Sequence, residues 1–305
     1  MNIAIGIPAY NEEKNIGSII VKLKKLANTI IICDDGSTDS TAEIAKGLGA
    51  IVISHSKNQG YGAAIKTIFL ESKNKKVDIL ITFDADGQHQ IEDIAEVLKP
   101  INLDNADIVI GSRFLNNETK IPTYRKIGVK AITQLTNITT GSNITDSQSG
   151  FRAYNKLALE KIIPTESGMG ISTEILIKAE EKNLRITEVP IKISYEGNTS
   201  THNPVSHGTS VVFTTLKFVA IKHPLTFYGI PGIILFGIGL IFTAWTIQVF
   251  SVHGEFITNI AIIGGGSLIL GIMLLITASI LFSVVSTINE KNKADNVWRK
   301  KFYFG

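Results

Sequence analysis

The feature that most constrains this chain of 305 residues is a pair of long segments without charged side chains. Neither 224–254 nor 256–289 contains an Asp, Glu, Lys or Arg, and only Glu255 separates them. A helix needs roughly 20 apolar residues to cross the core of a bilayer, and 228–250 and 257–285 both reach that length. Buried core helices of soluble proteins seldom run so far without a charge. We therefore predict two membrane-spanning helices.

Basic residues lie at both ends of this apolar region but not between its two segments. The connector 251–255 has neither Lys nor Arg, whereas Lys217 and Lys222 precede the first segment. The tail 290–305 carries five basic residues against two acidic ones. The positive-inside rule therefore places the connector outside and both termini in the cytoplasm. We expect an integral protein of the cell membrane, in contact with the lipid bilayer, whose globular part is cytoplasmic.

An amphipathic segment precedes the spans. Its apolar residues gather on one side of a helical projection: Val211, Val212, Phe213, Leu216, Val219 and Ala220. This pattern favours a helix on the membrane surface, and a helix packed on the globular part is the alternative.

No signal peptide is expected, because the apolar run at the N-terminus is short and lacks a basic start. The predicted parts are a globular domain (1–205), this helix (206–223), the hairpin (224–289) and a basic tail (290–305).

Composition excludes several classes of function. Lys and Arg number 30 and Asp and Glu number 27, which gives a net charge of only +3. This excess is too small for a polyelectrolyte that binds nucleic acid. The single cysteine, Cys33, excludes an intramolecular disulfide framework and a cysteine-based zinc site. A buried structural thiol fits its position at the end of an apolar run.

Apolar runs and helical spacing alternate through the globular part. The expected strands are 3–7, 29–33, 50–53, 77–83 and 107–111, and the expected helices are 12–27, 38–48, 62–72, 91–98 and 124–136. This rhythm predicts an α/β fold with a mostly parallel sheet and helices on both faces. Ligands in such folds bind beyond the carboxyl ends of the strands.

Four of these strand ends carry unusual polar residues. They are Pro8-Ala-Tyr-Asn-Glu-Glu13, Asp34-Asp-Gly-Ser-Thr-Asp39, Asp84-Ala-Asp-Gly-Gln-His89 and Gly111-Ser-Arg113. Such residues also cap helices and make turns. Because all four ends meet at one edge of one sheet, we interpret them as a binding site.

Asp84-Ala85-Asp86 predicts a metal site. In an extended segment the two carboxylates point the same way, because side chains alternate. They would repel each other unless a cation lay between them, and Mg²⁺ or Mn²⁺ is held by one or two carboxylates with substrate phosphates. Gln88 has the same parity and adds a neutral oxygen. We therefore expect a divalent cation at Asp84, Asp86 and Gln88, where it would neutralise a diphosphate leaving group.

Asn58-Gln-Gly-Tyr-Gly-Ala-Ala64 is similar to a glycine-rich phosphate loop. Gly60 and Gly62 are spaced as in a dinucleotide fingerprint, but Ile65 takes the place of its last glycine. Two interpretations stay open, a backbone-amide cradle at a helix start and a tight turn.

Six motifs occur in the order seen in family 2 glycosyltransferases. They are Ile7-Pro-Ala-Tyr-Asn-Glu-Glu13, Asp34-Asp-Gly-Ser-Thr-Asp-Ser-Thr41, Asn58-Gln-Gly-Tyr-Gly62, Asp84-Ala-Asp-Gly-Gln88, Gly111-Ser-Arg-Phe114 and Asp146-Ser-Gln-Ser-Gly-Phe-Arg152. With two C-terminal spans, the chain resembles the dolichyl-phosphate mannose synthase and polyprenyl-phosphate glucosyltransferase branch. The resemblance implies the GT-A fold and a divalent metal. It also implies a nucleotide-diphosphate sugar donor, of the GDP-mannose or UDP-glucose type, and a dolichyl or polyprenyl phosphate acceptor.

The resemblance also implies roles for single residues. The nucleotide sugar would contact Pro8, Ala9, Tyr10, Glu12, Asp35, Gly36, Gly60, Asp84, Ala85 and Asp86. The acceptor phosphate would contact Arg113, Arg125 and Lys126, and the catalytic residues would be Asp86, Arg113 and Arg125. Further donor or acceptor contacts would come from Asp146, Gln148, Arg152 and His202. Arg152 either contacts the donor or only pairs with Asp146.

Two positions depart from the family pattern. Val129 stands where a Ser commonly follows the second arginine. The segment 195–207 lacks the usual Arg and Lys, and only His202 and His207 could take their place.

The expected reaction is inverting, metal-dependent transfer of a hexose to the acceptor phosphate. A phosphate monoester has a second pKa of about 6, so it is already an anionic nucleophile at neutral pH. It needs no strong general base, but it needs cations to bring two anionic substrates together. Arg113, Arg125 and the metal would supply them.

Three other functions compete with this one. A processive polysaccharide synthase would need a Gln-x-x-Arg-Trp motif and more spans, and neither Trp245 nor Trp298 lies in such a motif. A sugar nucleotidyltransferase would need a glycine-rich basic loop near the N-terminus. A catalytically silent, membrane-tethered scaffold would not need the intact metal triplet. The donor base, the sugar, the polyprenol and a homo-oligomer through the transmembrane helices stay open.

Overall fold

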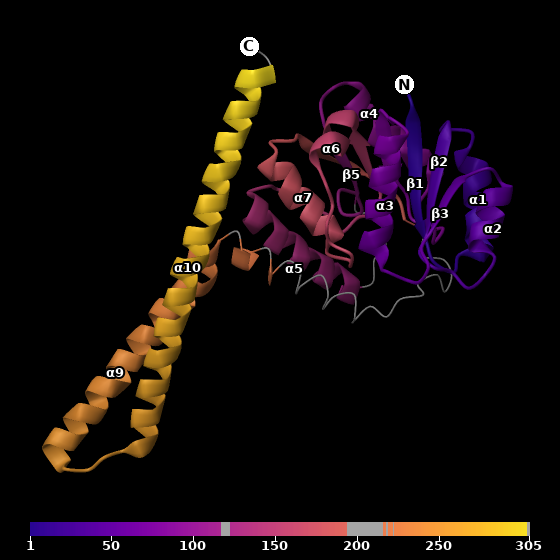
Figure 1. Cartoon of the computed structure of the whole chain (residues 1–305). Coiled ribbons are helices and arrows are strands. Elements are labelled where there is room, and N and C mark those ends of the chain that lie inside the picture. The colour runs from indigo at the N-terminus through magenta and orange to yellow at the C-terminus, as the bar shows by residue number, and fades with distance from the viewer. Residues whose placement is uncertain (117–122, 194–215, 218, 222, 304–305) are drawn as a thin grey trace. The chain divides into compact units, whose positions relative to one another are not determined.

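The computed structural model describes residues 1–116, 123–193, 216–217, 219–221 and 223–303. The chain divides into two compact units, Met1–Thr215 and Leu216–Gly305. Figure 1 shows the elements of both units along the chain, and the two units are described separately below.

In the described part of the first unit, seven strands form one sheet. They are β1 (Ile3–Ala9), β2 (Thr29–Asp34), β3 (Ile51–Ser54), β4 (Ile79–Thr82), β5 (Ile108–Ser112), β6 (Arg152–Asn155) and β7 (Ile186–Pro190). Their order is β3-β2-β1-β4-β6-β5-β7. Every neighbouring pair is parallel except those of β6, which is antiparallel to β4 and to β5. The predicted mostly parallel sheet is confirmed.

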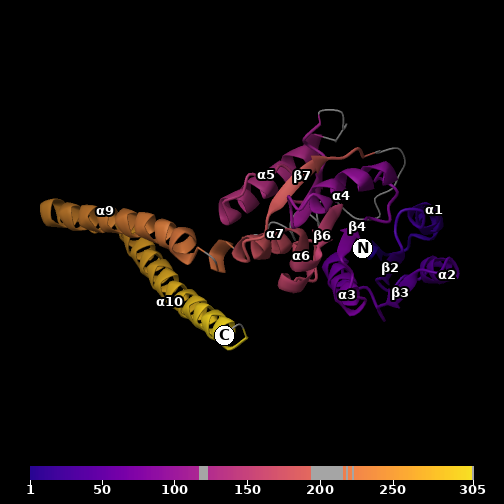
Figure 2. The ribbon, with the colours of Figure 1, turned by 90° about the horizontal axis from the view of Figure 1, so that it is seen from above.

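Helices cover both faces of this sheet (Figures 1 and 2). One face carries α1 (Glu13–Leu23), α2 (Thr41–Gly47) and α4 (Ile94–Asn102), which follows the short 3-10 helix η1 (Ile91–Asp93). The other face carries α3 (Tyr61–Asn74), α6 (Lys156–Lys161) and α7 (Ile171–Glu181). α5 (Thr123–Thr140) packs on α7.

The apolar periodicity explains why these segments are helices that face a sheet. In α1, the buried residues are Ile16, Ile19, Ile20 and Leu23, and this spacing of three and four residues forms a single stripe. The predicted helix 38–48 begins only at Thr41. The reason is that Asp39 accepts hydrogen bonds from the amides of Thr41 (3.0 Å) and Glu13 (3.2 Å), so the preceding residues belong to a loop.

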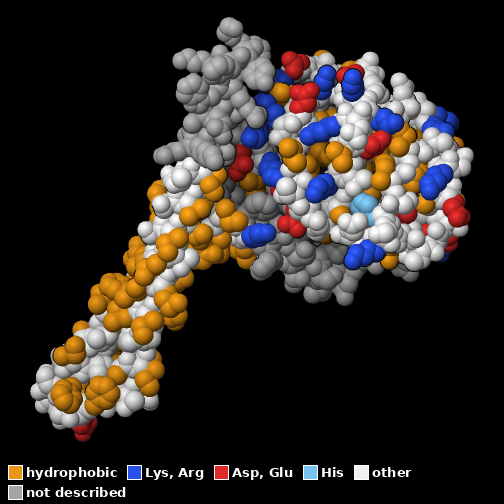
Figure 3. All heavy atoms as spheres, viewed as in Figure 1, with side chains coloured by type: hydrophobic (Ala, Val, Ile, Leu, Met, Phe, Trp, Pro, Cys, Tyr) orange, Lys and Arg blue, Asp and Glu red, His pale blue; other side chains and the backbone are white. Residues whose placement is uncertain are grey.

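The second unit contains a helical hairpin. A turn of π-helix, η2 (Leu225–Gly229), leads into α9 (Ile230–His253), and α10 (Thr258–Tyr303) returns along it (Figure 1). Leu225–His253 and Thr258–Ile288 are long and apolar enough to cross a membrane. Hydrophobic side chains cover the outside of the hairpin (Figure 3), for example Ile241 and Ile262. Exposed apolar surface of this extent is expected in lipid and not in water.

Glycines allow the two helices of the hairpin to approach closely. A Cβ atom on Gly239 would lie 2.6 Å from the backbone nitrogen of Leu268, and one on Gly271 would lie 2.6 Å from that of Phe236. By contrast, a Cβ on Gly265 would meet no atom within 4 Å. The turn between the helices is shorter than predicted, because α9 continues to His253 and ends at the left-handed Gly254 (φ 68°).

Most of the predicted amphipathic helix, 206–223, lies outside the described residues. Within it, 216–217 and 219–221 are helical. The interpretation as a membrane-surface helix stays a prediction.

Candidate active site

The predicted motifs come together at one edge of the sheet. β1, β2, β4 and β5 all end at this edge, and register pairs Ala9 with Asp34 at the ends of β1 and β2. Because β6 runs the other way, its first residue reaches the same edge, where Arg152 pairs with Thr82 and with Ile110. The motif that precedes β6 therefore joins the four strand ends identified in the sequence.

The loops after β1 and β2 are bound to each other. The amide of Asn11 donates to Ser37 Oγ (2.9 Å), and its side-chain oxygen accepts from the amide of Thr38 (2.9 Å). The amide of Glu12 donates to Thr41 Oγ1 (2.8 Å). These contacts fix the backbone on both sides of the predicted nucleoside contacts. Among the residues predicted to contact the nucleotide sugar, Ala9 is buried, and Pro8, Tyr10, Glu12 and Gly36 are half-buried.

Asp35 connects the end of β2 to the glycine-rich loop. Its Oδ1 accepts from His55 Nδ1 (2.6 Å) and from the amide of Gln59 (2.9 Å), and its Oδ2 accepts from the amide of Gly60 (2.8 Å). The side chain is buried. Asp35 therefore shapes the loop beside the site, and His55 is a contributor that the sequence did not indicate.

The glycine-rich loop packs against the segment 166–168. A Cβ on Gly60 would lie 2.7 Å from the carbonyl oxygen of Ser167, and one on Gly62 would lie 2.5 Å from that of Gly168. The amide of Ala63 donates to Ser167, while those of Gln59 and Gly60 donate to Asp35. Since these amides already have partners, the structure favours the tight turn over the phosphate cradle.

The predicted metal motif lies in a turn. The expectation that strand alternation aligns its two carboxylates is therefore wrong. β4 ends at Thr82, and Asp84-Ala85-Asp86 is not an extended segment. The carboxylate of Asp84 accepts from Tyr61 Oη and from His89 Nε2, both at 3.2 Å. The Asp86 carboxylate accepts from the amide of Gln88 (3.0 Å). Strand alternation therefore does not align the two carboxylates; the turn and these partners place them.

Three carboxyl groups near this turn influence one another. Burial raises the pKa of Asp86, and the charge of Asp84 raises it further. Burial also raises the pKa of Glu12, with additions from Asp86 and Asp84. The pKa of Asp84 is lowered, because hydrogen bonds from His89 and Tyr61 outweigh its burial. Negative charge thus gathers at the end of β4.

These carboxylates do not form a closed metal cage. Within the described residues, no group of three His, Cys, Asp or Glu side chains is arranged to hold a metal ion. The oxygen donors of Asp84 and Asp86 nevertheless suit a hard divalent cation, which commonly takes only one or two protein carboxylates and fills its other positions with substrate oxygens and water. The residues present fit such an ion.

Arg113 is clamped by Asp146. Its Nε donates to Asp146 Oδ2 (2.6 Å) and its Nη2 donates to Asp146 Oδ1 (2.8 Å), a bidentate pair. The Asp146 side chain is fully buried. Burial alone would raise its pKa, but the charge and hydrogen bonds of Arg113 outweigh it, and the pKa of Asp146 is lowered. Asp146 therefore pairs with Arg113 and not with Arg152.

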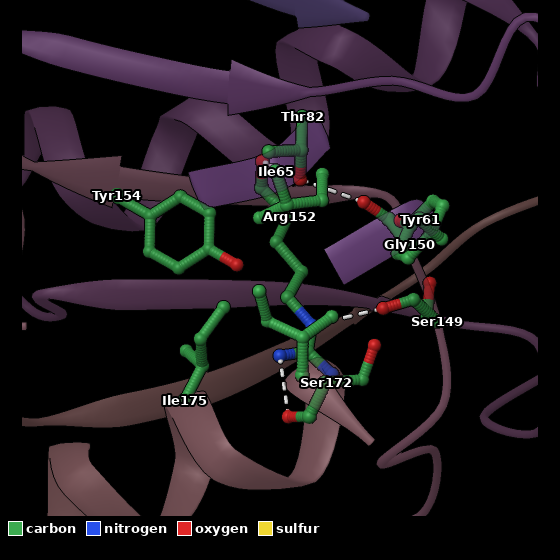
Figure 4. A pocket seen from close by; sticks show the side chains of 10 residues that line it. Tyr61, Ile65, Thr82, Ser149, Gly150, Arg152, Tyr154, Ser172 and Ile175 are labelled. Carbon is green, nitrogen blue, oxygen red and sulfur yellow. Dashed lines mark hydrogen bonds between the residues drawn. The ribbon is translucent and has the colours of Figure 1, made fainter. Parts of the chain in front are cut away.

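Arg152 is a buried structural residue. Its guanidinium donates to three backbone carbonyls, those of Ser147 (2.7 Å), Ser149 (2.9 Å) and Ser172 (3.0 Å), beside a small pocket (Figure 4). These bonds fix the segment that enters β6. Only 1% of the residue is exposed, so its predicted donor contact has little surface with which to form. The Gln148 side chain likewise donates within the protein, to Ser147 Oγ and Thr173 Oγ1.

Gly150 is a site residue that the sequence motif contained but did not explain. A Cβ at this position would lie 2.5 Å from Asp84 Oδ2 and 2.6 Å from Tyr61 Oη. Only a glycine lets the segment before β6 approach the metal motif so closely.

The structure describes only some of the remaining residues that were predicted to contact the donor or the acceptor. Arg125 and Lys126 belong to the first turn of α5, in the predicted helix, and Lys126 is exposed. The side chain of Arg125 lies outside the described residues, as do His202 and His207. Their roles stay predictions.

Comparison with known proteins identifies relatives of this chain. Residues 4–163 match the family model described as glycosyl transferase family 2. An uncharacterized protein of Methanocaldococcus jannaschii is 41% identical over 215 residues, which cover 69% of this chain and 86% of that protein. The UDP-N-acetylglucosamine–dolichyl-phosphate N-acetylglucosaminyltransferase of Methanococcus voltae is 37% identical over 228 residues, which cover 68% of this chain and 89% of that enzyme.

A solved structure shows the same fold. It is glucosyl-3-phosphoglycerate synthase from Mycobacterium tuberculosis in complex with Mn²⁺, UDP and glucosyl-3-phosphoglycerate. The similarity has a TM-score of 0.56 and covers 71% of this chain and 79% of that one, at 21% sequence identity.

Proposed function

This chain belongs to glycosyl transferase family 2 and is a glycosyltransferase of its polyprenyl-phosphate branch, and we propose that it transfers a hexose from a nucleotide diphosphate to the phosphate of a membrane polyprenol. The observation that carries the proposal is the meeting of two kinds of charge at one sheet edge. Asp84 and Asp86 follow β4 and Arg113 follows β5, and only β6 lies between these two strands in the sheet.

The two charges suit two anionic substrates. The carboxylates, with Pro8, Tyr10 and Glu12, form the proposed donor side. Arg113, with Arg125 and Lys126 of α5, forms the proposed acceptor side, since a guanidinium fork matches a phosphate and stays charged at any relevant pH. The M. voltae relative, named for a nucleotide-sugar donor and a dolichyl-phosphate acceptor, supports the choice of these two classes of substrate.

The chain's own residues position the reacting groups. Tyr61 and His89 fix the Asp84 carboxylate, and Asp146 fixes the guanidinium of Arg113. The acceptor phosphate is anionic at neutral pH and attacks the anomeric carbon opposite the leaving nucleotide diphosphate, so the configuration inverts. A divalent cation, Mg²⁺ or Mn²⁺, held by Asp84, Asp86 and Gln88 would neutralise the charge of that leaving group. The Mn²⁺ and UDP in the structural relative support this part of the proposal.

The hairpin would keep the enzyme beside its lipid substrate. A polyprenyl phosphate lies in the bilayer, and α9 and α10 are long and apolar enough to cross it. We place the first unit and both termini in the cytoplasm, because the connector between the helices lacks Lys and Arg.

The direct test is to incubate membranes containing the full chain with polyprenyl phosphate and a panel of radiolabelled nucleotide sugars. We expect one donor to yield a labelled polyprenyl-phosphate sugar of inverted anomeric configuration, and no product without the lipid. A labelled polymer would identify a processive synthase. Nucleotide binding without transfer from any donor would identify a silent scaffold.

A further inference from the structure

We propose that Glu188, on the edge strand β7, is a positioning residue that holds Arg113 ready for the acceptor phosphate by fixing Asp146. The inference rests on the proposed function, because Arg113 is assigned to the acceptor there. Glu188 belongs to none of the six sequence motifs and lies 75 positions after Arg113 in the chain.

The Glu188 carboxylate binds the segment that carries Asp146. Glu188 Oε2 accepts from the amide of Thr145 (2.8 Å) and from Thr145 Oγ1 (2.9 Å), and its Oε1 accepts from the amide of Asp146 (2.9 Å). The three donors are two backbone amides and one hydroxyl, all uncharged, so this carboxylate fixes a segment of the chain and does not neutralise a base. The carboxylate accepts hydrogen bonds from two successive backbone amides, those of Thr145 and Asp146.

The fixed segment supports Arg113 from two sides. Asp146 holds the guanidinium through two hydrogen bonds, and its Oδ2 also accepts from the Arg113 amide (3.2 Å). Thr145 Oγ1 lies 2.6 Å from Ser112 Oγ, which in turn accepts from the amide of Phe114 (3.2 Å). Ser112 therefore contacts Thr145, Arg113 contacts Asp146 and Phe114 contacts Ser112, so the segment 112–114 is attached to the two residues that Glu188 holds.

The fold explains why this support is needed. Thr145 and Asp146 lie in an irregular segment between α5 and β6, without a strand ladder of their own. An arginine side chain has many rotamers, and binding must oppose their loss unless the guanidinium is already oriented. Ile110 of β5 pairs with Glu188 of β7, so the sheet places Glu188 beside the strand that Arg113 follows. The register between β5 and β7 therefore determines where Glu188 lies relative to the guanidinium of Arg113.

The Asp146 carboxylate orients the guanidinium of Arg113. A guanidinium has five N–H donors, and the Asp146 carboxylate takes two of them. The bidentate contact fixes one edge of the guanidinium and so sets the orientation of its plane. Orientation, more than added charge, is the expected contribution of Glu188.

The test is Glu188→Gln in the full-length enzyme, with Glu181→Gln as the matched control on an exposed glutamate of α7. A glutamine amide offers one acceptor and turns an NH₂ group toward a backbone N–H, so at least one of the three bonds is lost. We expect the KM for polyprenyl phosphate to rise about tenfold, as the loss of a charge-assisted hydrogen bond implies. The KM for the nucleotide sugar should change less than about twofold, and the control should match the wild type.

A double-mutant cycle separates positioning from general support of the fold. In an Arg113→Ala background, Glu188→Gln should have almost no further effect on the acceptor KM, because the group that it positions is gone. Additive effects, or equal changes in donor and acceptor KM, would overturn the inference. If Glu188→Gln fails to fold, Thr145→Val removes one of the three bonds and the contact with Ser112 Oγ but keeps both amide bonds to Glu188, and it should show a smaller change with the same acceptor selectivity.

The cycle also distinguishes the two proposals. If Arg113→Ala leaves the acceptor KM unchanged, the acceptor role of Arg113 in the proposed function is wrong. If Arg113→Ala raises the acceptor KM and Glu188→Gln does not, that role stands and the positioning role of Glu188 is wrong.

Discussion

The carboxylate of Asp84 is held by two side chains that the sequence motifs did not connect with it. His89 packs against Phe83 and Phe151, with ring centroids 5.5 and 5.2 Å away, and its Nε2 approaches Asp84. Because an ionised carboxylate can only accept, the proton of this hydrogen bond belongs to His89. The aromatic packing thus fixes the ring, and the ring fixes the carboxylate.

Replacing Gly150 should disturb this arrangement without a change of charge. In Gly150→Ala the new Cβ would meet Asp84 and Tyr61 at less than van der Waals distance, so the carboxylate must move. We expect kcat/KM for the nucleotide sugar to fall about tenfold or more, since overpacking of this kind costs about 1–3 kcal/mol. Steady-state kinetics measure it. Gly47→Ala, where a Cβ would meet nothing within 4 Å, is the control and should behave as wild type. Equal kinetics for the two variants would contradict the close approach.

Asp86 is the residue on which metal dependence can be tested. Asp86→Asn keeps the shape of the side chain and removes the charge that would face a cation. We expect turnover to fall about a hundredfold or more, as for other groups that stabilise developing charge, and the Mn²⁺ concentration for half-maximal activity to rise. Glu92→Gln, on an exposed glutamate, should change neither value. Full activity of Asp86→Asn in the presence of a chelator would show that the assignment is wrong.

At the scale of elements, an ion pair secures the end of the sheet away from the site. Asp107, just before β5, accepts from the amide and side chain of Arg185, which precedes β7, and from Asn155 Nδ2 at the end of β6 (2.8 Å). One carboxylate therefore links three strands. Hydrogen bonds from Arg185 are the main reason that the pKa of Asp107 falls from 3.8 to about 2.

This pKa predicts a pH-dependent contribution to stability. Because the folded-state pKa is below the unfolded one, the ionised carboxylate stabilises the fold above about pH 4. That contribution is lost as the pH falls through about 2. Asp107→Asn should therefore lower the thermal midpoint of the full chain in detergent at pH 7, and the difference from wild type should shrink between about pH 4 and pH 2. Glu180→Gln is the control, since Glu180 is exposed and lies in α7, away from Arg185 and Asp107. A difference that persists at pH 2 would contradict the linkage.

The hairpin depends on glycines that face the other helix. In Gly239→Val the side chain would collide with the backbone near Leu268, so the helices must separate. We expect a loss of about 1–3 kcal/mol in the free energy of unfolding, the usual cost of overpacking, measured as a lower thermal midpoint in detergent. Gly237→Val tests the same helix at a position where a Cβ would meet no atom within 4 Å. Similar losses for the two variants would show that helix propensity, and not packing, determines the effect.

At the scale of the whole molecule, the proposed topology places the turn of the hairpin outside the cell. Val252→Cys puts a thiol in the last turn of α9, where the native side chain is 67% exposed. An impermeant maleimide should label it in intact cells. Asn292→Cys, in the basic tail, should react only after permeabilisation, and the native Cys33 is buried and should stay unlabelled. The reverse labelling pattern would mean that the hairpin is inverted.

Local features of the sequence were sufficient for the elements as far as α5 and for the location of the site, whereas β6, α6, α7 and β7 were not predicted. Apolar spacing predicts strands and helices because the apolar side chains are the ones that become buried. All five predicted strands and all five predicted helices are present, with shifted ends. The strand-end motifs predicted the edge at which Asp84, Asp86 and Arg113 gather, because parallel strands share one carboxyl edge. Charge-free length alone predicted two helices that suit a membrane.

What the sequence determined by itself is therefore what depends on neighbours along the chain: periodicity, strand ends and apolar length. Only the tertiary structure decided which groups become partners across it. The antiparallel β6 brings Gly150 against Asp84, the clamp of Arg113 is Asp146 and not another acid, and Glu188 of β7 holds that clamp. A hydrogen bond needs its donor and acceptor within about 3 Å, and strand order and register set those distances between residues that are far apart in the sequence.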